Sequence, residues 1–529
     1  MTPNPARRSV LLAGAALLTG CSVATPSDTK APPAPAAAPT ALLRGDEEFR
    51  PQYHYTSELH QINDPNGLLW YAGEYHLFHQ YNIDGAVHWG HAISTDFLHW
   101  ERLEPALYPD EIGNIWSGSA VVDERNTSGL QDGDEKVLVA IFTYSQHPNG
   151  KQSQGLAYSN DKGRTWTKHP ANPIVPNTGQ KDFRDPKVFW HEGTSKWIMV
   201  VSMGDHLEFH TSSNLINWTP AGTFGRDHGA HGGAWECPDL FELPVQGTQE
   251  RRWVLSVSVT DGAPAGGSGM QYFIGDFDGH TFHNENSPDT TLWQNFGKDY
   301  YAGVTWGDRP FPDNRRLMIA WTDNWQYREV VPTEPFNGQL SLVRELQLRR
   351  YNDGIRLVQN PAAEYTQLRQ WLGTWSAETV TKDNNLLQHI NGDCLEISMT
   401  VDVRSSTCSE VGIDLRTGPG QRTRVGYNVT TEKMFVDRAE SGKVPERDGK
   451  DIGGTWDNTY EAPLAPENGR VTLRILLDRS SLELFGNERE QISALILPSR
   501  ENTGLATYTD GEAKIEQLTL HRMTTIFHS

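Results

Sequence analysis

The stretch STDFLHW (94–100) introduces a pattern that recurs along the chain. In each copy a turn rich in Ser, Asp, Asn or Gly is closed by an aromatic residue. The other copies are SNDKGRTW (159–166), SSNLINW (212–218) and GDFDGHTF (275–282). Three of the four copies follow an apolar strand-like run, and a fifth apolar unit follows at RLMIAWTDNWQY (316–327). Taken singly these are ordinary hairpin turns, but their recurrence favours a five-bladed β-propeller.

The rest of the chain also indicates an all-β protein. Short apolar runs such as KVLVAIFTY and KWIMVVSM alternate with turn residues over positions 48–355, which we predict to be the propeller. The segment 356–371 is predicted to be a connector, in which NPAAEYTQLRQW is helical. Beyond it, runs such as CLEISMTVDV alternate apolar and polar residues, so that 372–529 is predicted to form a β-sandwich.

The N-terminus has the features of a targeting segment. Residues 1–20 combine basic residues with the apolar run LLAGAALLTG, which is too short to span a bilayer as a mature helix. The sequence LTGC ending at Cys21 resembles the lipobox of bacterial lipoproteins, in which the cysteine is lipidated. Residues 21–47 are rich in Pro and Ala and are predicted to be an extended tether. The expectation is export and lipid anchoring at a bacterial cell envelope.

Composition narrows the range of functions. The chain has 529 residues, which favours two folded domains. Its formal net charge of −21 argues against binding to nucleic-acid phosphates and is compatible with a neutral substrate. Cys394 and Cys408 either pair in an oxidising compartment or remain free thiols, and sequence alone does not decide between these states.

Three acidic residues occupy similar sequence settings. Asp64 lies in NDPNG, Asp185 in FRDPKVF and Glu236 in WECPDLF, each in a different predicted blade. A proline follows each of them closely and restricts the backbone there. A single Asp-Pro usually marks a turn. A set of three whose side chains can converge on a propeller axis instead suggests carboxyl groups with separated pKa values, as glycoside hydrolysis requires.

The three motifs, in this order, resemble glycoside hydrolase family 32, the fructan hydrolases and invertases. Further matches are HWGHAIS (88–94), WSGSAV (116–121), IAWTDNWQY (319–327), LSLVREL (340–346) and LLDRSSLELFGN (476–487). The resemblance covers nearly everything after residue 48. It implies a five-bladed propeller with an appended β-sandwich. It also implies a retaining reaction on terminal β-fructofuranosyl units of levan, inulin or sucrose, with no cofactor.

The resemblance also implies roles for individual residues. Asp64 would be the nucleophile, Glu236 the general acid and base, and Asp185 the stabiliser of the transition state. The implied substrate-binding residues are Asn63, Gln80, Trp89, Trp116, Ser117, Arg184, Asp239, Trp321 and Trp325. Two departures from the family pattern are Gln61-Ile62, where Trp-Met is usual, and the short IDGAV before His88. They bear on which Trp contacts the sugar.

Other functions fit the sequence less well. His88 and His91 flank Trp89, but no Cys or carboxylate at ligand spacing accompanies them, so no metal is predicted. A sucrose-preferring invertase and a fructosyltransferase remain alternatives within the same chemistry. A fructan-binding lipoprotein without catalysis would be expected to lack one of the three carboxylates. A structural propeller would not need an aromatic, carboxylate-lined axis.

Overall fold

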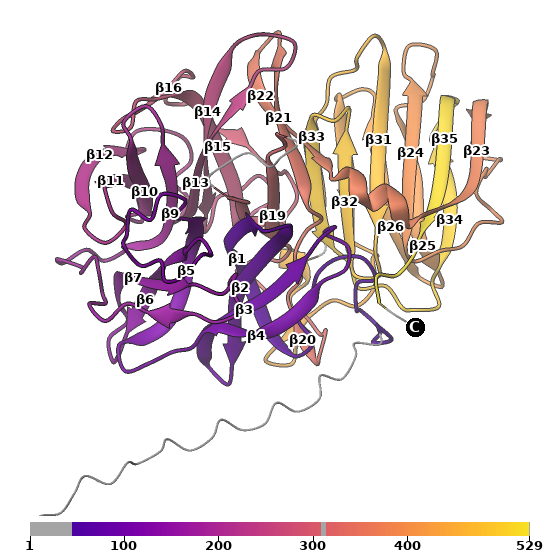
Figure 1. The fold of residues 1–529 in the computed structure, drawn as a ribbon. Coiled ribbons are helices and arrows are strands. Elements are labelled where there is room, and N and C mark those ends of the chain that lie inside the picture. Colours follow the sequence, from indigo (N-terminus) through magenta and orange to yellow (C-terminus); the bar gives the residue numbers. More distant parts are fainter. Residues whose placement is uncertain (1–44, 308–313, 457, 528–529) are drawn as a thin grey trace, which may run out of the picture. The chain divides into compact units, whose positions relative to one another are not determined.

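A computed structural model describes residues 45–307, 314–456 and 458–527. The predicted signal peptide, Cys21 and most of the tether lie outside these residues. Within the described residues, no helix is long and apolar enough to cross a membrane. The described chain is almost entirely β-structure, and Figure 1 shows its strands in chain order from indigo to yellow.

Five sheets between His60 and Pro361 form the blades of a β-propeller, as predicted. The first contains β1 (His60–Tyr71), β2 (Glu74–Ile83), β3 (Ala86–Ser94), β4 (Glu101–Leu107) and β20 (Phe336–Asn337). The second contains β5 (Gly113–Val122), β6 (Leu138–Gln146), β7 (Lys151–Ser159) and β8 (Thr167–Lys168). The third contains β9 (Arg184–His191), β10 (Lys196–Ser202), β11 (Leu207–Ser212) and β12 (Thr219–Phe224).

The last two blades complete the ring. The fourth contains β13 (Trp235–Pro244), β14 (Arg251–Val259), β15 (Gly269–Phe277), β16 (Phe282–Asn284) and β17 (Leu292–Trp293). The fifth contains β18 (Tyr301–Thr305), β19 (Leu317–Trp321), β21 (Arg344–Tyr351) and β22 (Gly354–Pro361). The first strands of the blades, β1, β5, β9, β13 and β18, contact one another in turn, and β18 returns to β1. They therefore surround the propeller axis.

The repeated motif lies at the same place in four blades, between the third and fourth strands. In three of them the closing tryptophan donates its indole N–H to the carbonyl three residues earlier. The pairs are Trp100 with Phe97 (3.0 Å), Trp166 with Gly163 (3.0 Å) and Trp218 with Leu215 (2.8 Å). In the first blade the Asp96 carboxylate also accepts the backbone N–H groups of Leu98 and His99. The sequence repeat is therefore a structural device that fixes one turn per blade.

The C-terminal part is a two-sheet sandwich. One sheet has the order β23 (Arg369–Val380), β35 (Ala513–Met523), β24 (Leu395–Asp402), β31 (Arg470–Leu477), β32 (Ser481–Gly486) and β33 (Glu490–Leu495). The other has the order β30 (Thr459–Pro463), β27 (Lys433–Asp437), β26 (Gln421–Asn428), β25 (Glu410–Gly418) and β34 (Gly504–Thr509). Short elements β28 (Glu446–Arg447), β29 (Lys450–Asp451) and α1 (Gly453–Trp456) precede β30. Apolar side chains from both sheets form its core.

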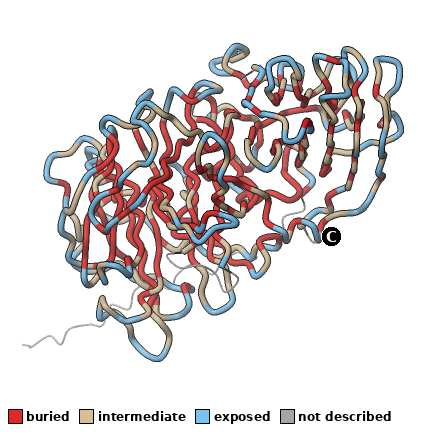
Figure 2. Tube along the Cα trace, turned by 90° about the horizontal axis from the view of Figure 1, so that it is seen from above, coloured by how far each residue is buried: buried red, intermediate tan, exposed pale blue. Residues whose placement is uncertain are grey.

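The connector is shorter than the sequence suggested. Strand β22 continues to Pro361 and β23 begins at Arg369, so a single 3-10 helix, η1 (Ala363–Leu368), links the two domains. The helical prediction for 360–371 is therefore wrong at both ends, where the residues pair in sheets. Cys394 and Cys408 are both buried free thiols. In Figure 2 the strands of both domains are largely buried and the connecting loops exposed.

Buried charges join the propeller to the sandwich. His54, from the segment before β1, lies between two sandwich carboxylates, 2.9 Å from Asp478 and 3.3 Å from Glu483. Arg344 of β21 donates to the same Glu483 at 2.7 Å. All four side chains are fully buried. Burial alone would lower the pKa of His54, but its two carboxylate partners outweigh burial and raise it to about 9.

This histidine should make stability depend on pH. Because the folded-state pKa is above the unfolded value of about 6.5, its stabilising contribution is complete below pH 6.5 and is lost as the pH rises to about 9. The loss should amount to about 3 kcal/mol. Thermal unfolding of the wild type and His54→Gln from pH 6 to 9 tests this. The variant should lose that slope, whereas His99→Gln, at an exposed histidine, should keep it. Parallel slopes in wild type and His54→Gln would contradict the assignment.

Candidate active site

Each of the five innermost strands is irregular at one end. The regular pairing is interrupted between Ile62 and Pro65 in β1, Trp116 and Gly118 in β5, Glu236 and Asp239 in β13, and Tyr301 and Val304 in β18. The same break occurs in β9 between Arg184 and Lys187. β-Bulges of this kind redirect side chains and are common beside active sites. The five breaks therefore turn one or more side chains of each blade toward the axis.

Although a single Asp-Pro usually marks a turn, NDPNG does not form one: all five of its residues lie inside β1. Pro65 is tolerated there because β1 is bulged at this point and stands at the inner side of its blade. Asp185 and Cys237 have positive φ angles of 61° and 46°, in a region that side chains other than glycine rarely occupy. Such strain in the backbone clusters at functional sites.

Asp64 is buried and surrounded by donors. Its Oδ2 accepts hydrogen bonds from the Ser117 hydroxyl at 2.6 Å and the Gln80 amide at 3.1 Å. The Cys237 thiol donates to the same oxygen at 3.5 Å. Its Oδ1 accepts from the Asn63 amide at 3.2 Å. Four donors from β1, β2, β5 and β13 thus hold one carboxylate in a fixed orientation.

Asp185 lies next to it, held through the backbone. Its Oδ2 accepts the Cys237 backbone N–H at 3.0 Å, and its own N–H donates to the Thr143 hydroxyl at 2.9 Å. Cys237 therefore donates to two carboxylates, through its thiol to Asp64 and through its amide to Asp185. Burial and the neighbouring carboxylates raise the pKa of the Cys237 thiol well above its usual range. The group stays protonated and acts as a donor.

Glu236 is the most accessible of the three carboxyl groups, with 16% of its side chain exposed. Its Oε1 accepts from Arg184 at 3.0 and 3.2 Å, and its Oε2 accepts the Tyr301 hydroxyl at 2.5 Å. Arg184 is also 3.9 Å from the Asp185 carboxylate and is paired with Asp182. One guanidinium thus holds three acidic groups, and its positive charge offsets part of theirs.

The electrostatics of the set follow from burial. Burial raises the pKa of Asp185, and the charges of Glu236 and Asp64 add to the shift while Arg184 opposes it. Burial also raises the pKa of Glu236, against the opposing effects of Arg184 and the Tyr301 hydroxyl. Asp185 and Glu236 therefore titrate together, because ionising both of them at once in a buried site is unfavourable. The site can therefore hold a proton and an anionic carboxylate together.

The predicted aromatic walls divide into two groups. Trp116 and Trp325 are half-buried and can contact a ligand. Trp89 and Trp321 are 1% and 0% exposed, so a direct contact with substrate does not fit their burial. Trp89 donates its indole N–H to the Trp116 carbonyl at 3.0 Å, and the Trp321 ring packs edge-on against Trp325 with centroids 5.3 Å apart. These two therefore support the walls.

Asp239, which the family resemblance implies to be a substrate-binding residue, also lies in the interior. It is fully buried, 3.1 Å from the Lys187 ammonium, and its Oδ2 accepts the Thr305 backbone N–H at 2.5 Å. These three residues come from β9, β13 and β18, and two of them, Lys187 and Thr305, line a narrow axial cavity that also contacts Asp185 and Cys237. Asp239 therefore ties three blades together beside the axis, and its full burial does not fit a direct contact with substrate.

The sequence did not point to Tyr301, and it indicated Cys237 only as a structural neighbour of the acid Glu236, without its contacts to Asp64 and Asp185. Both contact a catalytic candidate directly, yet neither residue type signals that role. A tyrosine in a strand-like run is more often a core residue, and Tyr301 is in fact fully buried. The available signal was positional: DYYAG begins the first strand of the fifth blade. The other four blades each place a functional candidate at that point.

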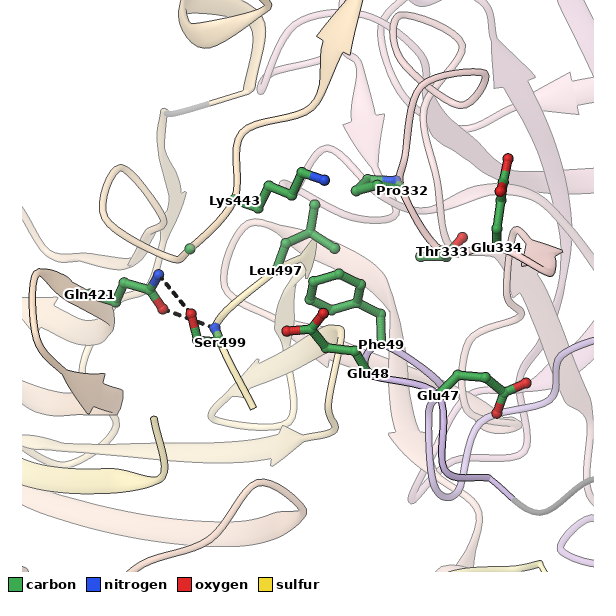
Figure 3. Close-up of a pocket in the computed structure, with 11 residues that line it drawn as sticks. Glu47, Glu48, Phe49, Pro332, Thr333, Glu334, Gln421, Lys443, Leu497 and Ser499 are labelled. Carbon is green, nitrogen blue, oxygen red and sulfur yellow. Dashed lines mark hydrogen bonds between the residues drawn. The ribbon is translucent and has the colours of Figure 1, made fainter. Parts of the chain in front are cut away.

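A second cavity, of about 360 Å³, lies apart from this site. It is lined by residues 47–49, 332–334, Gln421, Lys443, Leu497 and others of the sandwich. Figure 3 shows Gln421 hydrogen-bonded to Ser499 at its side and Lys443 extending over it. None of the residues singled out by the sequence lines it. Across the described residues, no cluster of three or more His, Cys, Asp or Glu side chains is placed to hold a metal ion.

Three carboxyl groups from three blades lie at the propeller axis, with an arginine between two of them. Paired carboxyl groups are the apparatus of a glycoside hydrolase. Comparison with known proteins agrees. Models of the N-terminal and C-terminal domains of glycosyl hydrolases family 32 match residues 54–361 and 364–522. A levanase of Bacillus subtilis is 50% identical over 490 residues, which cover 91% of this chain and 71% of that protein.

Two fungal proteins are also similar. An extracellular exo-inulinase of Aspergillus ficuum is 34% identical, with 91% of this chain and 96% of that protein covered. The crystal structure of an exo-inulinase from Aspergillus awamori superposes with a TM-score of 0.83 at 32% identity, covering 92% of this chain and 100% of that one. The chain belongs to glycoside hydrolase family 32.

Proposed function

We propose that this enzyme releases terminal β-fructofuranosyl units from fructans of the levan or inulin type, and from sucrose, with retention of configuration. The observation that carries the proposal is the convergence of Asp64, Asp185 and Glu236 from β1, β9 and β13. The names of its relatives, levanase and exo-inulinase, support the substrate class. Transfer of the fructosyl unit to a sugar is the alternative outcome at the same site.

In the first step Asp64 attacks the anomeric carbon of the terminal fructose. A carbon–oxygen bond to Asp64 forms while the bond to the leaving oxygen breaks, and Glu236 gives that oxygen its proton. In the second step Glu236, now a carboxylate, takes a proton from water, whose oxygen attacks the anomeric carbon and releases Asp64. The four donors on Asp64 orient it for attack. Both carboxyl groups end as they began.

Asp185 decides where the proton resides. In the free enzyme burial raises the pKa of Asp185 to about 7 and also raises that of Glu236, so that this pair retains a proton near neutral pH. A fructose whose hydroxyls donate to Asp185 would stabilise the ionised form of that carboxyl group. The shared proton would then reside on Glu236, beside the leaving oxygen. Substrate binding thus prepares the acid, and the Asp185 anion supports the positive charge of the transition state.

Removal of units from the chain end follows from the closed axis. Lys187, Asp239 and Thr305 connect three blades beside the carboxylates, and the axial cavity that Lys187 and Thr305 help to line is narrow. A site with one entrance admits a terminal unit, whereas an internal unit would need a second exit. Time-resolved chromatography on levan, inulin and sucrose tests the proposal. From levan and inulin, fructose should appear first and alone, whereas sucrose should give fructose and glucose in equal amounts. Early intermediate oligosaccharides would indicate internal cleavage, and kestose-type products would indicate transfer.

The Tyr301 hydroxyl should set the alkaline limit of activity. It donates to Glu236, which stabilises the carboxylate and lowers the pKa of that acid. Without it the pKa of Glu236 rises, so Glu236 stays protonated to higher pH. Tyr301→Phe should therefore move the alkaline limb of the kcat/KM profile upward by about one to two pH units. An unchanged limb in a folded variant would show that the hydrogen bond does not tune the acid.

We also propose export and lipid anchoring through Cys21. The support is the LTGC sequence, the tether after it, and an extracellular relative. Cys21→Ala should release the protein from membranes with its kinetics unchanged, because the catalytic candidates and their hydrogen-bond partners lie in the propeller after the tether. Sedimentation with membranes after a salt wash and assays of both forms measure this. Persistent sedimentation of the variant would contradict anchoring at Cys21.

A further inference from the structure

The segment that leads to Tyr301 lies along an edge strand of the sandwich. The backbone N–H groups of Phe296 and Asp299 donate to the carbonyls of Gln491 and Ser493 at 2.8 and 3.3 Å. In return, the N–H of Ser493 donates to the Asn295 side chain at 3.0 Å and that of Leu495 to the Asp299 carboxylate at 2.7 Å. Strand β33, the last in its sheet, thus has its edge groups paired by residues 295–299 of the propeller.

The approach is close enough to require glycine. A Cβ atom at Gly297 would lie 2.0 Å from the Ser493 carbonyl oxygen, although the φ angle there is not unusual. Residues 295–299 and strand β33 could not stay this close together if residue 297 carried a side chain. The sequence Asn295–Asp299 is therefore fitted to β33, and the sandwich fixes where β18 begins.

A buried cluster locks the end of this segment. Arg438, just after β27, donates to the Asp299 carboxylate at 3.0 Å and to the Tyr327 hydroxyl at 3.1 Å. Tyr327 in turn donates to Asp299. Arg438 also donates to the carbonyls of Leu495 and Trp456 at 2.8 and 2.6 Å. Arg438, Asp299 and Tyr327 are all 0–1% exposed, so the charges have no solvent to compensate for a lost partner.

Both ends of this cluster lead to the active site. Asp299 is two residues before Tyr301, whose hydroxyl contacts Glu236 at 2.5 Å. Tyr327 is two residues after Trp325, and the rings of Trp325 and Tyr301 pack edge-on with centroids 6.1 Å apart. Arg438 of the sandwich thus supports two parts of the site. One is Tyr301, which donates to the proposed acid Glu236, and the other is Trp325, which forms an aromatic wall.

We propose that Arg438 of the sandwich is a positioning residue for the acid Glu236, acting through Asp299 and Tyr301. The inference rests on the proposed role of Glu236 and extends it: the second domain belongs to the scaffold of the catalytic site. The charged and titratable groups that face Glu236 are Arg184 and Asp185 from β9, Asp64 from β1, Cys237 beside it and Tyr301 from β18. Of these, Tyr301 is the one linked to Arg438.

The test is a double-mutant cycle read out as a pH profile. Wild type, Arg438→Lys, Tyr301→Phe and the double variant are compared by kcat/KM on sucrose across pH. Lysine keeps the charge but cannot hold Asp299, Tyr327 and two carbonyls together. Arg438→Lys should move the alkaline limb upward by more than roughly 0.4 pH unit. A shift of that size exceeds the deviation from additivity that independent sites usually show, so that coupling to Tyr301 can be measured. In the Tyr301→Phe background it should cause no further shift.

Arg416→Lys is the matched control. Arg416 is equally buried in the sandwich and donates to backbone carbonyls of Asn502, Arg479 and Ser499, none of which belongs to the propeller. It should lower the melting temperature without moving the pH profile. Should Arg438→Lys fail to fold, Tyr327→Phe removes one hydroxyl from the same cluster and should shift the limb in the same direction by less.

The outcomes separate the two proposals. If the wild type releases no fructose from sucrose, levan or inulin, the proposed function fails and the inference with it. If the wild type is active and Tyr301→Phe shifts the limb, but the Arg438 and Tyr327 variants behave like Arg416→Lys, the inference alone is overturned. A shift for Arg438→Lys that adds in full to that of Tyr301→Phe also overturns it, because the route through Tyr301 would then be excluded.

Discussion

Asp64→Asn is expected to lower kcat on levan, inulin and sucrose by about 10⁴-fold or more. The amide has the same shape as the carboxylate but is a poor nucleophile, so the covalent step is lost while binding surfaces remain. KM should change far less than kcat. Steady-state kinetics with single-turnover measurements would place the loss in the chemical step.

The structure also sets the expected cost in stability. One amide oxygen can still accept from Asn63 or Ser117, but the amide nitrogen would then face other donors. The free energy of unfolding should fall by about 1–3 kcal/mol, which leaves the protein folded. Asp110→Asn is a suitable control, because Asp110 also accepts several hydrogen bonds, from Tyr144 and Lys168 among others, and neither of these partners is one of the three catalytic candidates. Fructose release near the wild-type rate by folded Asp64→Asn would rule out Asp64 as the nucleophile.

Glu236→Ala should have the second largest effect, and it should depend on the leaving group. On fructans and sucrose the rate should fall by about 10²–10⁴-fold, since the leaving oxygen is no longer protonated. An activated leaving group needs little protonation, so its first step should largely survive. Added azide should then replace the missing base in the second step and yield a fructosyl azide of retained configuration.

A control on the same strand isolates this effect. Glu242, also in β13, is partly exposed and paired with Arg251, so Glu242→Ala should leave turnover of all substrates unchanged. An equal loss for good and poor leaving groups in Glu236→Ala, together with no azide product, would exclude Glu236 as the acid and base. Such a result would make Asp185 the candidate acid, because burial also raises the pKa of that carboxyl group.

The fold could be predicted from the sequence because its repeat has a local cause. Each turn between the third and fourth strands is closed by short-range hydrogen bonds, such as that from Trp100 to Phe97, and these leave a signature within seven or eight residues. The three carboxylates could be named because each lies in a distinctive motif. The connector could not be predicted correctly, since residues 360–361 and 369–371 look helical but pair in sheets, the first with the neighbouring β21 and the second with the distant β35.

The details of the site depend on contacts that are distant in sequence. The bulge at Asp64 is defined by its pairing with β2, and the donors to its carboxylate come from Gln80, Ser117 and Cys237, up to 173 residues away. Whether a tryptophan lines a wall or supports one depends on the blade behind it, which is why Trp89 and Trp116 could not be distinguished. Tyr301 was missed for the same reason: its role is visible in its distance from Glu236 and not in its own neighbourhood.

The central claim is that Asp64 forms a covalent bond to fructose while Glu236 serves as its acid and base. The most direct test is to trap this intermediate in Glu236→Ala with an activated fructosyl substrate, and to map the modified peptide by mass spectrometry. The account predicts one added fructosyl unit per protein, on the peptide that contains Asp64, and its loss on addition of azide. An adduct on Asp185, or turnover of the activated substrate with no adduct on any peptide, would contradict it.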